Sequence, residues 1–520
     1  MGPEGKSAGR IDGRGKWMAL AAALLGWLFD GAEMGVFSMV GRQAIKDLLE
    51  TSDERVIGLW FGVVTAGFLV GAATGGVLFG WLGDRIGRVR AMTLSVLVYS
   101  VFTGLCGVAG EAWQIGLLRF IAALGMGGEW SLGVALVMEV WPNRSRAFMA
   151  GLIGAAANVG YMMVGVVGLG LNSVIGRLGG WLLATGLSQE RVDWLVANQG
   201  WRLMMVLGTL PALLTFFIRL FVPESEKWQE EKAKGGTSGW AVQDLLGVAV
   251  GALGPALMVY LWAWEGPAWL PHTLPVRLIG TLLGLAVATA GYTYPLVRYL
   301  QRHAASGEAG QDWWPILRRM LLAALLSGVA LLGTWGSTQW APSWTDKLTA
   351  GTPGLHAKEW TQIVLAAGAI VGTILAALAG DWLGRRPVYA LLCLLSLASV
   401  FLLFQTNTAF GAGLLASAFV AGACTASFYG WLPLYLPELF PTRVRATGQG
   451  FGFNFGRILA AIGALQTGSL MGLFQKDVTV GGLTLAGGYP LACTAMSLIY
   501  LVGFAVIWLA PETRGRPLPD

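Results

Sequence analysis

The stretch GDRIGR at residues 83–88 recurs in the second half of the chain as GDWLGRR at residues 380–386. A second motif, E-x-x-P-x-R-x-R, begins at Glu139 and recurs, residue for residue, beginning at Glu438. The first pair of motifs is separated by 297 residues and the second by 299. Two different motifs that repeat at nearly one distance predict a chain built from two similar halves.

The composition of the chain is that of a membrane protein. Hydrophobic residues make up 55% of the 520 residues and charged residues 12%, whereas a typical soluble domain has roughly 45–50% and about 25%. The mean hydropathy is +0.62. The apolar residues fall in blocks of about 20, the length of helix that crosses the ~30 Å hydrocarbon core of a bilayer. We therefore expect an all-α polytopic membrane protein, and we exclude a disordered chain and a cytosolic enzyme.

Fourteen apolar blocks are candidate membrane spans. Two of them, 242–264 and 276–299, form a pair inserted between two sets of six. We expect an N-terminal half over 1–230, an inserted two-helix region over 231–310 and a C-terminal half over 311–520. The blocks of the two halves are 17–41, 56–82, 91–110, 113–141, 147–171, 201–221, 317–341, 360–383, 387–405, 409–436, 446–472 and 486–510.

The distribution of basic residues predicts the orientation in the membrane. With the N-terminus inside, the inner segments hold 23 Lys and Arg residues and the outer loops hold 10. Basic residues concentrate on the cytoplasmic side of membrane proteins. We therefore expect a multi-pass protein of the plasma (cytoplasmic) membrane, that is, the cell inner membrane, with both termini in the cytoplasm.

The sequence offers no pattern for a metal, a cofactor or a nucleic acid. The four cysteines lie in apolar blocks at unrelated spacings, and the three histidines lie in expected loops, so neither set forms a metal site. No Walker A, H-E-x-x-H or G-x-S-x-G sequence occurs, and no basic run contains interleaved aromatic residues. We expect a non-enzymatic monomer in the lipid bilayer whose partners are a small solute and a coupling ion.

The repeated motifs carry a resemblance to a known family. Two parallel six-helix halves with G-D-x-x-G-R loops resemble the major facilitator superfamily of secondary transporters. PES at 223–225 and PET at 511–513 are similar to the sugar-porter branch. GGEW at 127–130 and LPELFPTR at 436–443 are similar to proton symporters for aromatic acids, sialate and small carboxylates. The resemblance implies a carrier whose two halves rock about a central cavity.

Ionisable residues inside the apolar blocks are candidate functional residues, because each costs at least ~2.5–3.5 kcal/mol at the centre of a membrane helix. Counting ~1.5 Å per residue places Glu33 and Arg119 at similar depth, so they can pair, and protonation of the acid would release the arginine. The resemblance implies the same arrangement, and Glu33 matches the acid of sugar porters better than Asp30. The predicted proton-coupling residues are Glu33, Asp30, Arg119 and Glu129. The alternative is a static ion pair.

Arg457 is the candidate for binding the solute. It lies near the middle of the block 446–472 and follows Asn454 by three residues, so the amide and the guanidinium can share a helix face. A guanidinium binds a carboxylate with two hydrogen bonds, and transporter sites lie near the midplane. We predict an anion bound by Arg457 and Asn454; the alternative is a structural pair of Arg457 with Asp30 or Glu129. The expected cavity liners are Asn158, Tyr161, Trp335 and Gln339.

The charged residues of the repeated loops are predicted to gate the carrier. Asp84 follows a helix end and is expected to approach the N-terminus of a helix in the other half, where the helix dipole favours an anion. The other charges would complete a network that stabilises the state open to the outside, as the resemblance also implies. Positive-inside anchoring would explain the arginines but not the acids. The predicted gating residues are Gly83, Asp84, Arg85, Gly87, Arg88, Glu139, Arg146, Asp381, Arg385, Glu438 and Arg445.

These predictions favour a proton-coupled symporter of a small organic anion that works by alternating access. The sequence does not distinguish among carboxylates, aromatic acids and sialate as the transported anion. A sugar or polyol proton symporter is the first alternative, although the segment 333–340 lacks the paired glutamines typical of that branch. A drug–proton antiporter is the second, because fourteen spans are also typical of such exporters. Sodium stays open as the coupling ion.

Overall fold

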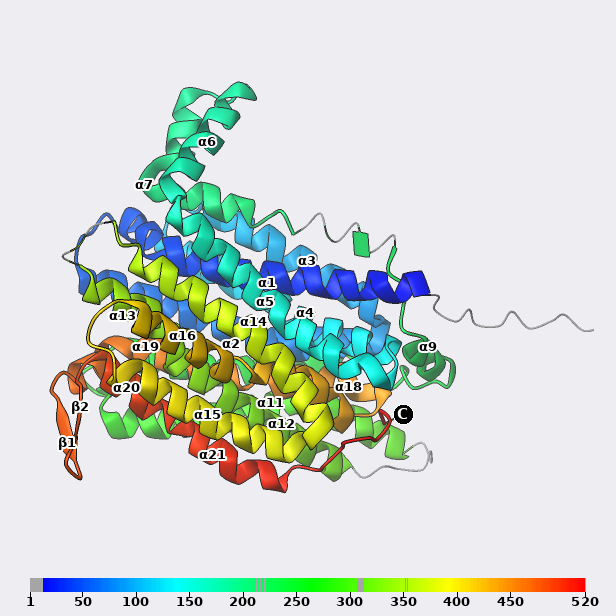
Figure 1. The fold of residues 1–520 in the computed structure, drawn as a ribbon. Helices are drawn as coiled ribbons and strands as arrows, with labels where there is room; N and C mark the ends of the chain where they lie inside the picture. The colour runs from blue at the N-terminus through cyan, green and yellow to red at the C-terminus, as the bar shows by residue number, and fades with distance from the viewer. Residues whose placement is uncertain are drawn as a thin grey trace, which may run out of the picture.

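The computed structural model describes residues 13–519 apart from 212–213, 215–216, 219–220, 306–312, 351 and 353. Long helices run side by side through the molecule (Figure 1), and the strands among the described residues form one short antiparallel hairpin, β1 (Val478–Val480) with β2 (Leu483–Leu485). Twelve helical segments in this part of the chain are long and apolar enough to cross a membrane. The prediction of an all-α polytopic membrane protein is confirmed.

The helices fall into three groups along the chain. The first group contains α1 (Gly13–Leu48), α2 (Glu54–Ile86), α3 (Arg88–Leu105), α4 (Ala112–Val140), α5 (Asn143–Leu169), α6 (Leu171–Ala184) and α7 (Gln189–Leu207). The second contains the short α9 (Glu226–Ala233) and the pair α10 (Leu245–Ala263) and α11 (Leu274–Ala305). The third contains α12 (Trp313–Gly336), α13 (Ala341–Leu348), α14 (Ala357–Leu383), α15 (Arg385–Gln405), α16 (Ala412–Thr425), α17 (Phe428–Tyr435), α18 (Arg445–Asn454), α19 (Gly456–Leu473), α20 (Tyr489–Ser497) and α21 (Ile499–Val506).

Two of the fourteen expected spans are not among the twelve. The block 201–221 lies partly outside the described residues, and α7 covers its beginning. The block 446–472 is not one helix, because α18 ends at Asn454 and α19 begins at Gly456. The inserted pair is present as α10 and α11. Fourteen is therefore an approximate number for the spans.

Small residues let the helices of the first group approach closely. Gly71 and Gly75 lie one turn apart on α2, where a side chain would collide with the backbone carbonyl of Phe120 or Leu124 on α4. Glycines repeated at a spacing of four are typical of membrane helices whose backbones pack together. α2 and α4 are accordingly in contact over much of their length.

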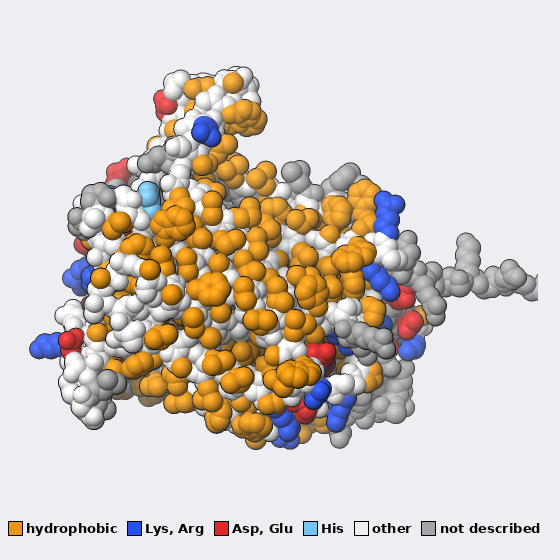
Figure 2. Space-filling model, viewed as in Figure 1, with side chains coloured by type: hydrophobic (Ala, Val, Ile, Leu, Met, Phe, Trp, Pro, Cys, Tyr) orange, Lys and Arg blue, Asp and Glu red, His pale blue; other side chains and the backbone are white. Residues whose placement is uncertain are grey.

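The sides of the bundle are hydrophobic and its two ends are charged. Figure 2 shows a broad hydrophobic surface along the helices, with the charged side chains gathered at the two ends. Large apolar side chains on the outside of the helices are exposed, for example Leu282 on α11 and Leu375 on α14. A contiguous apolar surface of this extent is unusual on a soluble monomer and fits the hydrocarbon core of a bilayer.

The pair α10 and α11 packs against both other groups of helices. α10 contacts α2 and α19, and α11 contacts α2, α12 and α18. A hydrogen bond of 2.7 Å joins the hydroxyls of Thr74 on α2 and Tyr292 on α11. Arg302 at the end of α11 makes two bonds to Asp244, just before α10, at 2.5 and 2.6 Å. The contacts with the other groups attach the pair to the bundle, and the Arg302–Asp244 bonds join the start of α10 to the end of α11.

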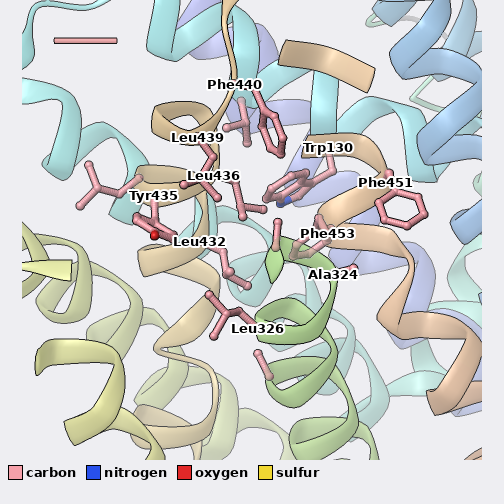
Figure 3. Close-up of a cluster of buried hydrophobic side chains, with 14 of the residues drawn as sticks. Trp130, Ala324, Leu326, Leu432, Tyr435, Leu436, Leu439, Phe440, Phe451 and Phe453 are labelled. Carbon is pink, nitrogen blue, oxygen red and sulfur yellow. The ribbon is translucent and has the colours of Figure 1, made fainter. Parts of the chain in front are cut away.

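A cluster of buried hydrophobic side chains joins the first and third groups of helices (Figure 3). Trp130 on α4 stacks on Phe453 of α18, with ring centroids 3.7 Å apart and an interplanar angle of 5°. Leu432 and Leu436 lie in the same cluster. Because the stacked rings come from different groups, the two groups cannot separate at this level without exposing both rings.

Candidate functional site

A central cavity lies between the first and third groups of helices, with an empty volume of about 1040 Å³. A second pocket of about 900 Å³, which we call the vestibule, adjoins it and reaches Lys358 at the beginning of α14. The liners that both share are Met34, Tyr161, Trp335 and Gln339. We call the end of the bundle that carries the loops 83–88 and 380–386 the motif end. Because α14 runs from Lys358 to the second loop, the vestibule leads toward the opposite end.

Arg457 contributes a cation to the wall of the cavity. Its guanidinium lies 5.5 Å from the centre of the Phe453 ring. Two of its nitrogens, Nε and Nη1, have no hydrogen-bond partner among the described residues, and no carboxylate of that part of the chain lies within ion-pair distance. Asp30 is close enough for its charge to act on the guanidinium. The guanidinium of Arg457 therefore has nitrogens available for an anion.

Aromatic rings make up much of the remaining wall. The cavity is lined by Trp27, Trp130, Tyr161, Trp335, Tyr429 and Phe453. Asn158 and Gln339 line it as well, and the Asn158 amide donates to the carbonyl of Gly154 at 2.9 Å. The hydroxyls of Thr338 and Thr425 bond to each other at 3.2 Å. A few polar groups in an aromatic wall fit a small, flat solute that carries a charged group.

Asn454 lies outside the cavity. Its amide donates to the carbonyls of Gly127 on α4 and Gly450 on α18, both at 3.0 Å, and its side chain is fully buried. The expected common face of Asn454 and Arg457 assumed one continuous helix. In the structure the amide contacts the first group of helices, whereas the guanidinium of Arg457 on α19 lines the cavity.

Glu33 and Arg119 form a buried ion pair between α1 and α4. Arg119 Nη1 lies 2.6 Å from Glu33 Oε1, and both side chains are almost fully buried. The guanidinium lies 3.9 Å from the Phe37 ring and 4.6 Å from the Phe68 ring. Arg119 lines the vestibule, whereas Glu33 lines a side pocket of about 620 Å³. The pair therefore lies beside the route from the opposite end to the cavity.

Asp30 and Glu129 form a second acidic site one turn along α1. Asp30 lines the cavity, and its carboxyl group is within hydrogen-bonding range of that of Glu129. The Glu129 carboxyl group lies against Gly26, where a side chain would collide with it. The four predicted proton-coupling residues are thus arranged as two separate pairs.

At the motif end, three groups from the first half of the chain bond to the second. Asp84 accepts the backbone N–H groups of Ala446 and Thr447 at 3.2 and 2.8 Å, and the Thr447 hydroxyl at 2.6 Å. It therefore lies at the N-terminus of α18, where the helix dipole favours an anion. Arg88 donates to the carbonyl of Thr442 at 2.7 Å. Glu139 lies 2.8 Å from Arg445.

The two halves repeat the same contacts around each loop. Arg88 lies 3.1 Å from Glu139, and Arg385 lies 2.7 Å from Glu438. The Ser225 hydroxyl bonds to Glu139, and the Thr513 hydroxyl bonds to Glu438 at 2.6 Å. Each loop turns at a glycine with positive φ, which other residues rarely adopt. These glycines are Gly87 (113°) and Gly384 (109°).

Glu224 and Glu512 cap the helices that follow the loops. Glu224 accepts the backbone N–H groups of Arg88 and Val89 at the start of α3, and Glu512 accepts those of Arg385 and Arg386 at the start of α15. Burial raises the pKa of Glu224. Burial acts in the same direction on Glu512, but its backbone hydrogen bonds hold the pKa of this carboxyl below its usual value. Sequence reasoning missed these roles, because the bonded groups are more than a hundred residues apart.

The contacts between the halves at the motif end are asymmetric. Asp84 is buried, whereas 47% of the Asp381 side chain is exposed and its bond is to Arg385 in its own loop at 3.4 Å. Arg146, the repeat equivalent of Arg445, is buried close to Glu438. The remaining predicted gating residues are Gly83, whose Cα packs near Leu132, and Arg85, whose guanidinium lies 5.0 Å from the Trp81 ring.

The model of the "Sugar (and other) transporter" family matches residues 17–245 and 318–520. The chain belongs to this family of the major facilitator superfamily. The match leaves out residues 246–317, which include α11 and all of α10 after its first residue. This transporter is a multi-pass membrane protein that moves a small solute, and members of the superfamily are not enzymes.

Curated relatives cover almost the whole transporter. The cis,cis-muconate transport protein of Acinetobacter baylyi is 26% identical over 487 residues, which are 93% of this chain and 92% of the relative. The niacin transporter NiaP of the same organism is 26% identical over 500 residues, 95% and 93% of the two chains. The structure of the proton:xylose symporter XylE of E. coli superposes with a TM-score of 0.62 at 17% identity, over 97% of each chain.

Proposed function

We propose that this transporter is a proton-coupled symporter of a small organic anion, of the carboxylate, aromatic-acid or sialate type. The observation that carries the proposal is Arg457, a cavity-lining cation with two nitrogens unpartnered among the described residues. A guanidinium offers two parallel N–H groups to one carboxylate, and the aromatic wall fits a flat or unsaturated solute. Two relatives are named for muconate and niacin, which are small unsaturated acids.

Glu33 is proposed to carry a transported proton. Its pair with Arg119 is buried beside the vestibule, and a buried pair is strongly affected when one partner is neutralised. Protonation from the opposite end would release Arg119 and let the two groups of helices rearrange. Return of the proton at the motif end would restore the pair.

The motif end is proposed to be the cytoplasmic gate, closed in this structure. Asp84, Arg88 and Glu139 all bond across to the second half, whereas the cavity shares four lining residues with the vestibule. This assignment follows the positive-inside tendency of basic residues and puts both termini in the cytoplasm. Alternating access would then break these bonds and close the vestibule.

Proton flux into proteoliposomes tests the proposal. Vesicles loaded with a pH dye receive nicotinate, cis,cis-muconate, sialate and xylose in turn. Acidification driven by one class of acid, and lost in Glu33→Gln, supports proton symport. Glu33→Gln is expected to retain solute exchange because the cavity is unchanged. Uphill, pH-driven accumulation that survives in Glu33→Gln contradicts the role of this residue.

The role of Arg457 has its own test. Arg457→Lys keeps the charge but loses the bidentate geometry, and a hydrogen bond to a charged group contributes ~1.5–3 kcal/mol. The KM for the transported acid is therefore expected to rise about 10- to 100-fold, while Arg42→Lys at the surface leaves it unchanged. Full affinity in Arg457→Lys would contradict anion binding here. It would favour the second candidate, a sugar or polyol symporter. This candidate is compatible with the family match and with the similarity to the XylE fold.

A further inference from the structure

The second acidic pair, Asp30 and Glu129, is not explained by the role proposed for Glu33. Glu129 is 2% exposed and lies on α4, and Asp30 lies on α1 at the cavity wall. The absence of a side chain at Gly26 lets the Glu129 carboxyl group reach α1. The two carboxyl groups consequently face each other at hydrogen-bonding range.

One oxygen of each carboxyl group lacks a donor. No N–H or O–H group of the described residues donates to Asp30 Oδ1 or to Glu129 Oε2. Two carboxylates at hydrogen-bonding range in a buried site cannot both be ionised, because each disfavours the charge of the other. A single proton between them removes one charge and supplies the missing donor.

The surroundings of the pair connect it to the solute site. The charges of Arg457 on α19 and Glu33 on α1 act on Asp30, and the two carboxyl groups act in turn on Tyr99 of α3. α5 and α17 contribute Tyr161 and Tyr429 to the same cavity. Arg457 is the cation nearest to Asp30 in the cavity wall, and it is also the group that has nitrogens free for an anion.

We propose that Asp30 and Glu129 share one proton and form a second proton site, separate from Glu33–Arg119 and linked to solute binding through Arg457. The proposal rests on the anion symport proposed above and adds a second transported proton. The positive charge of Arg457 favours the ionised form of Asp30. An anion bound to Arg457 offsets this charge and removes that effect. Solute binding therefore favours the shared proton, and by linkage the shared proton favours solute binding to the same extent.

Infrared spectroscopy of the purified transporter without solute is the first test. A shared proton gives the C=O stretching band of a protonated carboxyl group at pH 7. The difference spectrum between the wild type and Glu129→Gln is expected to show the loss of one such band, because the amide then donates to an ionised Asp30. Asp30→Asn is a second variant with the same expectation. Glu33→Gln and the exposed Glu265→Gln are the controls that keep the band.

Proton counting during transport is the second test. With nicotinate as probe, wild type is expected to take up two protons per solute, and Glu129→Gln or Asp30→Asn one. An unchanged ratio in both variants, or an unchanged carboxyl band, overturns the proposal. Absence of proton movement with every acid overturns the proposed symport instead. The infrared band of the resting protein does not depend on transport, so the two failures are distinguishable.

Discussion

Lys358 is a cation of the vestibule, which a solute would cross before it reaches Arg457 if the proposed route is correct. It is half-buried in the wall of the vestibule, and no carboxylate of the described residues lies within ion-pair distance of it. A lysine inside an apolar block is easily recognised in the sequence as a candidate functional residue. Lys358 lies just before such a block and was therefore not predicted to have a role. Its position at a low-dielectric mouth is where a fixed charge concentrates ions of opposite sign.

Lys358→Gln is expected to lower kcat/KM for nicotinate severalfold at low ionic strength. The loss should fade as salt is added, because the Debye length falls to about 8 Å at 0.15 M. Uptake rates measured from low to high salt test this. Lys347→Gln is the matched control, since Lys347 is an exposed lysine of the same end, on α13, that does not line the vestibule. A salt-independent loss, or the same loss in the control, would contradict electrostatic steering.

Among the elements, the caps on α3 and α15 show how the repeat is stabilised. Glu512 accepts the N–H groups of Arg385 and Arg386, both at 3.1 Å, in the first turn of α15. A carboxylate at a helix N-terminus contributes ~0.3–1 kcal/mol. The segment PET therefore acts as a cap that attaches the C-terminal tail to the second loop.

Glu512→Gln is expected to lower the free energy of unfolding by up to about 1 kcal/mol at pH 7. Because folding lowers the pKa of Glu512, the stabilisation is fully present above the ordinary glutamate pKa of about 4.3 and fades as the pH falls below it. Thermal unfolding in detergent at pH 7 and at progressively lower pH measures this, with Glu265→Gln in an exposed loop as control. A difference that persists unchanged in acid would contradict the cap.

The elements also show what the sequence could and could not predict. Apolar blocks and the constant offset of the motifs were enough for an all-α membrane fold, because burial in lipid demands long helices. Depth counting was enough to expect that Glu33 and Arg119 meet, and the structure has them 2.6 Å apart. The contact of the Asn454 amide with the carbonyl of Gly127 on α4 was not predicted, because the two residues are 327 apart in the sequence. The sequence placed Asn454 beside Arg457 at the solute site, and the structure has its amide bonded to α4.

Other parts of the site depend on tertiary contacts that no local pattern encodes. Tyr429 is one aromatic residue in an apolar block, and nothing nearby distinguishes a cavity liner from a lipid-facing ring. The pairing of Asp30 with Glu129 depends on Gly26, a glycine among 76. The asymmetry between Asp84 and Asp381 cannot be read from the shared pattern, because both loops carry the motif G-D-x-x-G-R. Under the proposed function, it reflects closure of the motif end.

At the scale of the whole molecule, this asymmetry predicts that two equivalent residues, Asp84 and Asp381, contribute unequally to closure of the motif end. Asp84 accepts three hydrogen bonds from the N-terminus of α18 in the other half. Asp381 bonds within its own loop and is 47% exposed. If the structure is the state closed at the motif end, removal of the Asp84 charge weakens that closure, whereas removal of the Asp381 charge leaves it nearly intact.

Asp84→Asn is therefore expected to shift the population away from the state open at the opposite end. A reporter cysteine, Met34→Cys at the junction of cavity and vestibule, is introduced after the four native cysteines are replaced by serine. A membrane-impermeant maleimide should label it about tenfold more slowly in Asp84→Asn, since one bond to a charged group contributes ~1.5–3 kcal/mol. In Asp381→Asn, the labelling rate of the reporter cysteine should stay within about twofold of the rate in the parent protein. Equal slowing in both variants would mean that the two loops share the closure equally, and the closed motif end would then not follow from the bonds of Asp84.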